Sequence, residues 1–142
     1  MAKNRRCGEC GVFAVEYRAS VGPFPWKDYR QVRLVKSIKV LTCSKCGNEM
    51  SLSGDAKLLD QAIEETITLQ SERFIEQIIA REHCRQIDLA AVLGVTPEHL
   101  SAIKNGSRIP SFQTFNFLKT LALDENAFKI ADPANFPKAA NG

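Results

Sequence analysis

Two short motifs with the same cysteine spacing constrain this chain more than any other feature. Residues 7–11 read CGECG and residues 43–47 read CSKCG. A C-x-x-C turn presents two thiolates to one metal ion, and a second such turn completes a tetrahedron of four sulfurs. The glycine after each pair allows a sharp turn that points backbone amides toward the sulfurs. The pattern predicts a metal site whose ligands are Cys7, Cys10, Cys43 and Cys46.

Four protein thiolates leave no ligand position for water or substrate, so we expect a structural zinc ion that stabilises the fold. Three other interpretations stay open. A disulfide framework requires an oxidising compartment, and the basic residues 1–6 are not followed by the apolar run of a signal peptide. A redox C-x-x-C motif needs one pair in a thioredoxin-like βαβ context, which neither motif has. An iron centre uses similar ligands, and the sequence does not exclude it.

The composition indicates a globular protein of one domain or two small ones. The chain has 142 residues, of which 44% are hydrophobic and 25% charged. No apolar stretch approaches the roughly 20 residues of a membrane helix, so we expect a cytoplasmic protein without membrane contact. Residues 1–50 carry ten Lys and Arg against four Asp and Glu, whereas residues 51–72 carry one Lys and five acids. The basic, cysteine-bearing part therefore suits an acidic partner, either nucleic acid or protein.

The first part of the chain predicts a zinc-ribbon-like module. Residues 12–17 and 32–41 are rich in strand-forming residues. The segment between them contains GPFPW at residues 22–26, which predicts a turn with exposed aromatic side chains. Phe24 and Trp26 either contact a partner or fill the small core of the module, and both roles stay open. Such a module buries little apolar surface, so the metal should supply most of its stability.

A helix is predicted from Asp55 to about Leu69. Its expected inward face consists of Leu58, Leu59, Ala62 and Ile63. The polar residues 66–72 predict the end of this helix and a junction between two domains, residues 1–70 and residues 71–142. Short helices should follow as far as Ala122, then a last one at residues 124–130 and a frayed tail beyond residue 133. The predicted fold class is α+β, with a small zinc-ribbon-like module containing a short β-sheet and a helix, followed by an all-α five-helix domain.

Residues 86–106 carry the pattern with the clearest functional meaning. Leu89 and Ala90, together with Leu93, lie on one face of a short helix that Gly94 ends in a left-handed conformation. Thr96 offers a hydroxyl cap for a second helix, and Pro97 suits its first position. Leu100 and Ile103 face inward on that helix, which ends at Asn105-Gly106. These features predict a helix-turn-helix motif whose second helix, residues 97–104, enters the major groove of DNA.

The motif resembles the Xre/lambda-repressor-like helix-turn-helix family. The family pattern QxxLAxxLGV(S/T)xxx(L/I)Sx(I/W)xxG is matched from Gln86 to Gly106 and continues to Pro110-Ser111. The resemblance covers about residues 73–123, where Phe112, Phe115, Leu118 and Leu121 form the closing helix of the expected domain.

The order of the two modules resembles the MqsA-type antitoxins, which carry a YgiT-type zinc finger before an Xre-type domain. This wider resemblance spans about residues 7–123. It implies a structural Zn²⁺ and an N-terminal half that neutralises a ribonuclease-type toxin. It also implies a C-terminal domain that forms a homodimer on a palindromic operator in double-stranded DNA and represses its own operon.

The resemblance places DNA contacts on and beside the second helix, but two positions depart from the family pattern. The family reads bases with an asparagine at the helix start and an arginine one turn later, where this chain has Glu98 and Ala102. Glu98 suits a cytosine amino group and Ala102 a thymine methyl group, so the operator differs or neighbouring residues read it. Glu98 also suits the positive end of the helix dipole. The expected contacts, including those to phosphates, are Arg85, Gln86, Thr96, Pro97, Glu98, His99, Ser101, Ala102, Lys104, Asn105 and Arg108.

Other reactive side chains predict no catalytic site. Cys84 lies in a helical, partly apolar context that is typical of a buried thiol. His83 stands beside it and points in another direction on a helix. No catalytic triad, phosphate loop or pair of carboxylates is visible, so we expect no enzyme. Two alternatives to an antitoxin stay open: a zinc-ribbon helix-turn-helix regulator without a toxin, and an interaction adaptor that no longer binds DNA.

Overall fold

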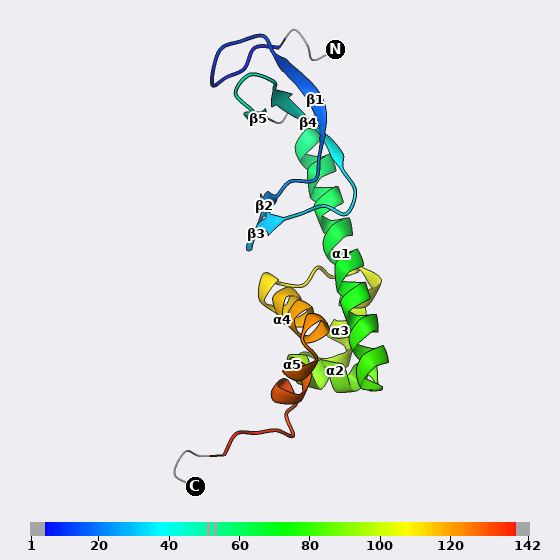
Figure 1. Ribbon diagram of the computed structural model, residues 1–142. Coiled ribbons are helices and arrows are strands. Elements are labelled where there is room, and N and C mark those ends of the chain that lie inside the picture. The colour runs from blue at the N-terminus through cyan, green and yellow to red at the C-terminus, as the bar shows by residue number, and fades with distance from the viewer. Residues whose placement is uncertain (1–4, 51, 53, 139–142) are drawn as a thin grey trace. The chain divides into compact units, whose positions relative to one another are not determined.

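The computed structural model describes residues 5–50, 52 and 54–138. In these residues five short strands precede five helices (Figure 1). The chain divides into two compact units, Met1–Thr66 and Ile67–Gly142. Helix α1, Asp55–Glu82, contributes its first part to the N-terminal unit and its second part to the C-terminal unit. The predicted α+β class, with a small β module before a helical region, is confirmed, whereas the domain boundary after residue 70 stays a prediction.

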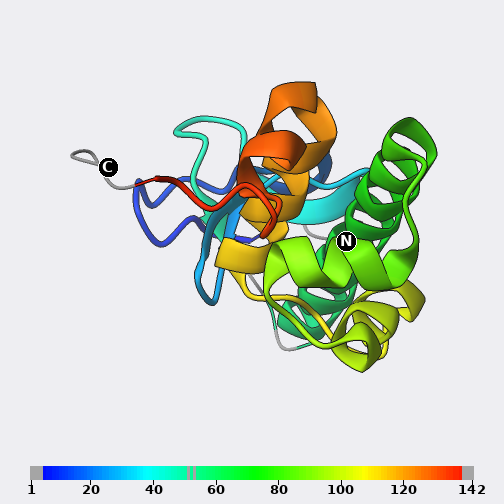
Figure 2. The same ribbon diagram turned by 90° about the horizontal axis from the view of Figure 1, so that it is seen from below.

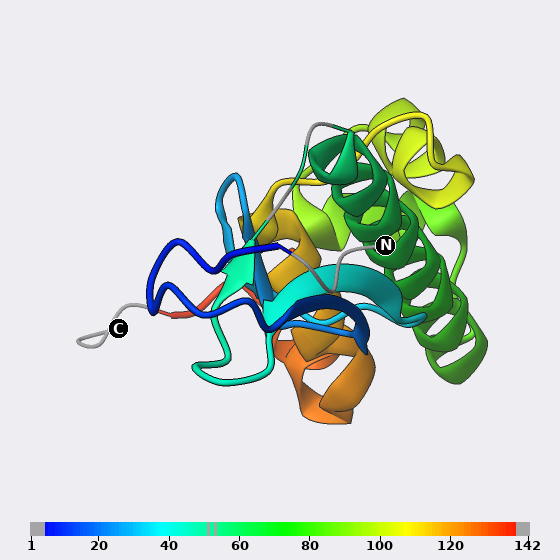
Figure 3. The same cartoon turned by 90° about the horizontal axis from the view of Figure 1, so that it is seen from above.

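A three-stranded antiparallel sheet forms the centre of the N-terminal unit. Its strands are β1 (Val15–Ser20), β4 (Ile38–Cys43) and β5 (Glu49–Met50), in the order β1-β4-β5 (Figure 3). Val15 pairs with Cys43, and Leu41 pairs with Met50. Because residues two apart on a strand share a face, Leu41 and Cys43 point to the same side. They form a small core with Val15 and Cys7, so the sheet supports the cysteine motifs directly.

A second, two-stranded sheet consists of β2 (Phe24–Trp26) and β3 (Tyr29–Val32). Phe24, Trp26 and Tyr29 are buried, and the Trp26 indole N–H donates a hydrogen bond of 3.2 Å to Oδ1 of Asp60 on α1. The exposed turn predicted at residues 22–26 is therefore wrong. Of the two roles left open for Phe24 and Trp26, the structure shows core packing. The proline between them is tolerated because a two-stranded sheet leaves one edge of each strand free of ladder hydrogen bonds.

The predicted strand bounds also need correction. The strand expected at residues 12–17 begins at Val15, because the carbonyl of Val12 accepts a hydrogen bond of 2.9 Å from the amide of Cys7 in the first motif. The strand expected at residues 32–41 is interrupted after Val32. There the amide of Leu34 donates to the carbonyl of Val21 at 2.8 Å, and that of Val35 donates to the Thr66 hydroxyl at 3.3 Å. These long-range bonds bend a segment whose composition favours a strand.

Helix α1 is longer than predicted. It runs for 28 residues without a break at the polar segment 66–72, so the expected end near Leu69 is wrong. Residues 55–82 contain neither proline nor glycine, and polar side chains alone do not stop a helix. Thr66 and Ser71 are in fact buried on it. The predicted inward face is wrong at Leu58, whose side chain is 62% exposed.

The C-terminal unit is a helical domain built around the second part of α1. Its other helices are α2 (Gln86–Leu93), α3 (Pro97–Asn105), α4 (Phe112–Leu123) and α5 (Glu125–Ala131). The last of these confirms the short helix predicted at residues 124–130, with the side chain of Asp124 accepting a cap hydrogen bond from the amide of Asn126. The described part of the predicted tail carries no helix or strand after Ala131, and residues 139–142 lie outside the described residues. The shared core consists of Ile75, Ile78, Leu89, Ala90, Val92, Leu100, Ile103, Leu118, Leu121, Ala122 and Phe128.

Alanine substitutions at the two glycines that end α2 and α3 should differ measurably in their effect on stability. Gly94 and Gly106 both have positive φ, 74° and 83°, so alanine is strained at either position by about 1–2 kcal/mol. A Cβ atom at Gly94 would meet nothing within 4 Å, whereas one at Gly106 would lie 2.9 Å from Cγ2 of Thr68. We expect Gly106→Ala to lower the free energy of unfolding by roughly 1–3 kcal/mol more than Gly94→Ala.

Urea unfolding followed by circular dichroism tests this difference. Thr68→Ser removes the Cγ2 methyl group and should abolish most of the excess cost of Gly106→Ala. The contact with Thr68 would not restrict this position if Gly94→Ala and Gly106→Ala lowered the free energy of unfolding equally. The same conclusion would follow if the larger loss caused by Gly106→Ala were unchanged when Thr68→Ser is also present.

Candidate metal centre and nucleic-acid interface

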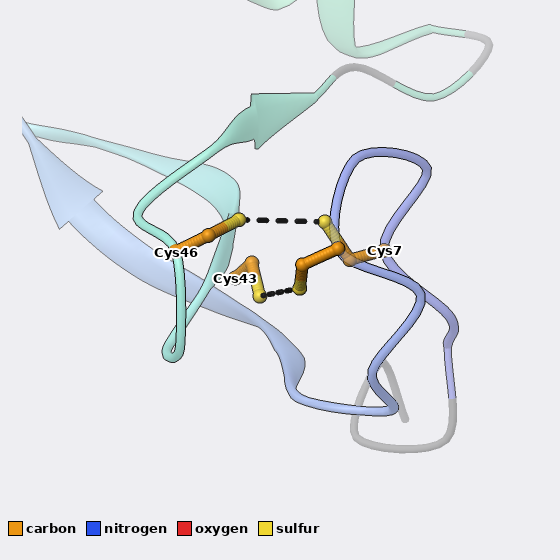
Figure 4. A group of neighbouring side chains, drawn as sticks. Cys7, Cys43 and Cys46 are labelled. Carbon is orange, nitrogen blue, oxygen red and sulfur yellow. Dashed lines mark hydrogen bonds between the residues drawn. The ribbon is translucent and has the colours of Figure 1, made fainter.

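The four cysteines of the two motifs converge in the N-terminal unit. Their Sγ atoms all lie within 4.8 Å of one another. The Sγ atoms of Cys7 and Cys46 are 3.6 Å apart, as are those of Cys10 and Cys43 (Figure 4). All four are free cysteines, and 3.6 Å is far beyond the roughly 2.05 Å of a disulfide. A tetrahedron with metal–sulfur bonds of about 2.3 Å has edges of roughly 3.8 Å, so this cluster can hold one metal ion.

Backbone turns of the same form position both pairs. In the first motif the amide of Gly11 donates to the carbonyl of Cys7 at 3.0 Å, and in the second that of Gly47 donates to Cys43 at 2.9 Å. Both glycines adopt positive φ, 74° and 76°, a conformation that glycine adopts without strain. The amide of Glu9 also donates to Sγ of Cys7 at 3.4 Å. The sequence prediction of tight turns with amides directed at sulfur therefore agrees with the structure.

These amides favour the thiolate form of the two buried cysteines. The amides of Cys10 and Glu9 lower the pKa of Cys7 to about 6, although burial opposes the shift. The amide of Cys46 lowers the pKa of Cys43 in the same way, again against burial. A thiolate is the form that binds metal, so these amides favour the coordinating form of both side chains. With four protein ligands no position is left for a substrate, and the centre has the chemistry of a structural site.

The predicted helix-turn-helix lies in the C-terminal unit, where a tight turn joins α2 to α3 (Figure 2). Gly94 is left-handed, and the amide of Val95 donates to the carbonyl of Ala90 at 3.0 Å. The Thr96 hydroxyl accepts a hydrogen bond of 3.1 Å from the amide of His99, and Pro97 occupies the start of α3. The predicted roles of Gly94, Thr96 and Pro97 are therefore confirmed, because each depends on backbone conformation that the local sequence specifies.

The structure brings most of the predicted DNA contacts onto or beside α3. Leu100 and Ile103 are fully buried, so they fix which face of the helix points away from the core. The exposed members of the predicted set are Arg85, Thr96, Pro97, Glu98, Ser101, Asn105 and Arg108. The half-buried members are Gln86, His99, Ala102 and Lys104. Their contact with DNA stays a prediction.

Arg85 has a partner that the sequence analysis missed. Its Nε lies 3.3 Å from Oδ2 of Asp88, and its backbone amide donates to the same oxygen at 2.9 Å. The Arg85 side chain, and after it the Arg85 amide, hold the pKa of Asp88 below its ordinary value. The i, i+3 spacing was the signal available in the sequence. Because exposed ion pairs of this kind contribute little to stability, Arg85 can release Asp88 at small cost.

The fifth cysteine lies outside the metal cluster. Cys84 is partly buried against the core of the C-terminal unit, and burial raises the pKa of its thiol. This is the structural role that its sequence context predicted. His83 is exposed and has a positive φ of 52°, so it ends α1 rather than continuing it.

Comparison with known proteins gives a family match to part of the C-terminal unit. A model described as Helix-turn-helix matches residues 75–117, which include α2, α3 and parts of α1 and α4. A search of curated proteins gives no match. In the described residues no helix combines the length and apolar character that crossing a membrane requires. The chain thus carries a DNA-binding domain of the helix-turn-helix class together with four clustered cysteines that can bind a metal. These are the features of a metal-containing transcription regulator.

Proposed function

We propose that this protein is a zinc-containing antitoxin that represses its own operon. Its C-terminal unit binds a palindromic operator as a homodimer, and its N-terminal unit binds and neutralises a toxin. The observation that carries the proposal is the helix-turn-helix match at residues 75–117 in a chain that also clusters four cysteines. The order of these two modules supports the antitoxin assignment through the resemblance to MqsA-type proteins.

The surface of α3 and its surroundings supports DNA binding. In helix-turn-helix proteins the second helix lies in the major groove, while residues beside it hold phosphates. Ser101 and Ala102 on α3 have short side chains that allow close approach to base edges. Arg85 and Arg108, both exposed, lie in the sequence before α2 and after α3, where they suit phosphate contacts.

Exposed apolar residues near the C-terminus support a homodimer. Leu123, Ile130 and Phe136 are 71%, 77% and 86% exposed, although Phe128 between them is buried in the core. Exposed large apolar side chains are typical of interaction surfaces. A symmetric dimer would supply two copies of α3 for half-sites separated by about one turn of DNA, roughly 34 Å.

The N-terminal unit has features of a partner-binding module. A four-thiolate metal site stabilises a fold without catalysing a reaction. In the part of the chain that the structure describes, β1 pairs with β4 on one edge and only through the Val15–Arg5 bridge on the other. Tyr17 is 42% exposed and Phe13 is 65% exposed. An acidic or strand-forming surface of a toxin would suit this basic unit.

DNA binding is tested by a gel shift with the DNA upstream of the protein's own operon. We expect a shift at low salt, and Ser101→Glu should weaken it at least about tenfold, because a new carboxylate on exposed α3 would face the bases and phosphates of the groove. Ala80→Glu adds the same charge at an exposed position of α1 and should leave the affinity nearly unchanged. The absence of a shift with the unmodified protein would contradict repression and favour the interaction adaptor.

Toxin binding requires a separate experiment. If a small open reading frame beside the gene encodes a toxin, co-expression should restore growth and the two proteins should co-purify. If the neighbour is harmless alone or does not co-purify, the antitoxin assignment fails. The protein would then be a zinc-ribbon helix-turn-helix regulator, which is the second candidate because the same DNA-binding domain supports it.

A further inference from the structure

The exposed face of α3 carries hydrogen-bond acceptors but no positively charged side chain. Residues 98, 101, 102 and 105 follow the i, i+3, i+4, i+7 spacing of one helix face. Glu98, Ser101 and Asn105 on this face are exposed, and Ala102 is half-buried. No arginine or lysine stands among these four positions. The face therefore lacks the bidentate cationic donors that most often read guanine.

Asn105 is not free to act as the main base reader. Its Oδ1 accepts a hydrogen bond of 2.9 Å from the amide of Ser107, which holds the turn after α3. An asparagine that reads adenine needs this oxygen for the amino group at N6 while its own amide donates to N7. The structure thus commits the acceptor of Asn105 to the protein backbone, and Ala102 has no side-chain hydrogen-bonding group.

Glu98 is the one charged group on this face and the one side chain there that can only accept hydrogen bonds. Its side chain is exposed in the first turn of α3, the end of a recognition helix that contacts base edges. Among the described residues it makes no hydrogen bond or ion pair. A carboxylate only accepts hydrogen bonds, so it needs a base that presents a donor in the major groove.

Only two bases present such a donor there, and they differ in what lies beside it. Cytosine presents its N4 amino group next to an apolar C5–H, whereas adenine presents its N6 amino group next to the acceptor N7. The second carboxylate oxygen of Glu98 would be repelled by N7. Guanine presents two acceptors, N7 and O6, and would repel both oxygens.

We infer that Glu98 makes α3 select cytosine at one position of each operator half-site and reject guanine there. This inference rests on the proposed DNA-binding function and adds the base that the site requires. Glu98 contacts the cytosine on one strand, so the half-site contains a C·G pair in a fixed orientation. A good bidentate contact discriminates by roughly 5- to 150-fold between bases, and we expect the single contact of Glu98 to fall at the low end of that range.

Selection of duplexes from a randomised DNA library by the full-length protein tests the inference. The unmodified protein should enrich cytosine at one position per half-site. Glu98→Gln keeps the size of the side chain but adds donors, and glutamine pairs well with adenine. We expect this variant to replace cytosine by adenine at that position and to retain the rest of the motif. Glu76→Gln, which neutralises an exposed carboxylate on α1, is the matched control and should select the unchanged motif.

The outcomes separate this inference from the proposed function. If Glu98→Gln selects the same base as the unmodified protein, base reading by Glu98 is overturned while DNA binding stands. If the unmodified protein selects no duplex at all, the proposed function fails and the inference fails with it. A thermal melt of the variant measures the other role of Glu98, its interaction with the dipole of α3. Loss of that interaction alone would lower the melting temperature without changing the selected base.

Discussion

Cys43→Ser is expected to abolish metal binding and unfold the N-terminal unit while the C-terminal helices stay folded. Cys43 is 1% exposed and packs with Val15 and Leu41, so it is both a ligand and a member of the core. A serine cannot supply the thiolate. Structural zinc in small modules contributes about 10–16 kcal/mol of apparent binding free energy. The free energy of unfolding of a whole domain is about 5–15 kcal/mol, so loss of the metal is enough to unfold the module.

Metal content by mass spectrometry and amide hydrogen exchange measure this effect. The variant should contain almost no metal and should exchange its amide hydrogens rapidly at β1, β4 and β5. A strong chelator should have the same effect on the unmodified protein. The C-terminal unit should keep its protection, because its core shares no residue with the cysteine cluster.

Cys84→Ser is the matched control. It removes a thiol from the edge of the C-terminal core and leaves the four clustered sulfurs untouched, so the metal content should not change. A full complement of metal in Cys43→Ser would rule out the four-thiolate site. Visible absorption of the purified protein would show iron in place of the expected zinc.

Arg81→Met should be the most destabilising of the polar substitutions in the C-terminal unit. The guanidinium group of Arg81 donates to the carbonyl of Ala122 at 2.8 Å and to that of Leu121 at 2.7 Å. These carbonyls lie in the last turn of α4, where the helix leaves them without internal partners. Gln77 adds a third bond, 3.0 Å long, to Ala122. Hydrogen bonds to charged groups contribute about 1.5–3 kcal/mol each, so we expect a loss on the order of 3 kcal/mol.

Two variants identify which contact of Arg81 is responsible. Glu82→Gln breaks the 2.6 Å ion pair with Arg81 but keeps both bonds to α4, and its cost should be smaller. Arg81→Lys keeps the charge but not the planar fork that reaches two carbonyls, and its cost should be intermediate. Thermal or urea unfolding measures these losses in stability. If Glu82→Gln destabilised the protein as much as Arg81→Met or more, the contact with α4 would not be the stabilising one.

The features that sequence reasoning predicted well are those determined over a few residues. The cysteine turns depend on Gly11 and Gly47, and the helix-turn-helix depends on Gly94, Thr96 and Pro97. Each of these residues acts on its own backbone or on an amide within a few positions, so a short pattern carries the information. The fold class followed from the same patterns.

The errors arose where distant residues compete with local preference. Phe24 and Trp26 looked like exposed turn residues, but Asp60, 34 positions beyond Trp26, accepts the indole hydrogen bond. The polar segment in the middle of α1 looked like the end of a helix, but packing covers Thr66 and Ser71 and the helix continues. Strand limits moved for the same reason, since hydrogen bonds such as that of Val35 with Thr66 connect residues far apart in the chain.

The same distinction applies to function. The amino-acid order alone identified the four cysteines and the helix-turn-helix, because ligand spacing and helix caps are local properties. Folding in three dimensions then established two further facts: the four sulfurs converge within 4.8 Å, and Asn105 is engaged by Ser107 while Glu98 is free among the described residues. These facts depend on where each side chain finds its partner, which no local pattern encodes.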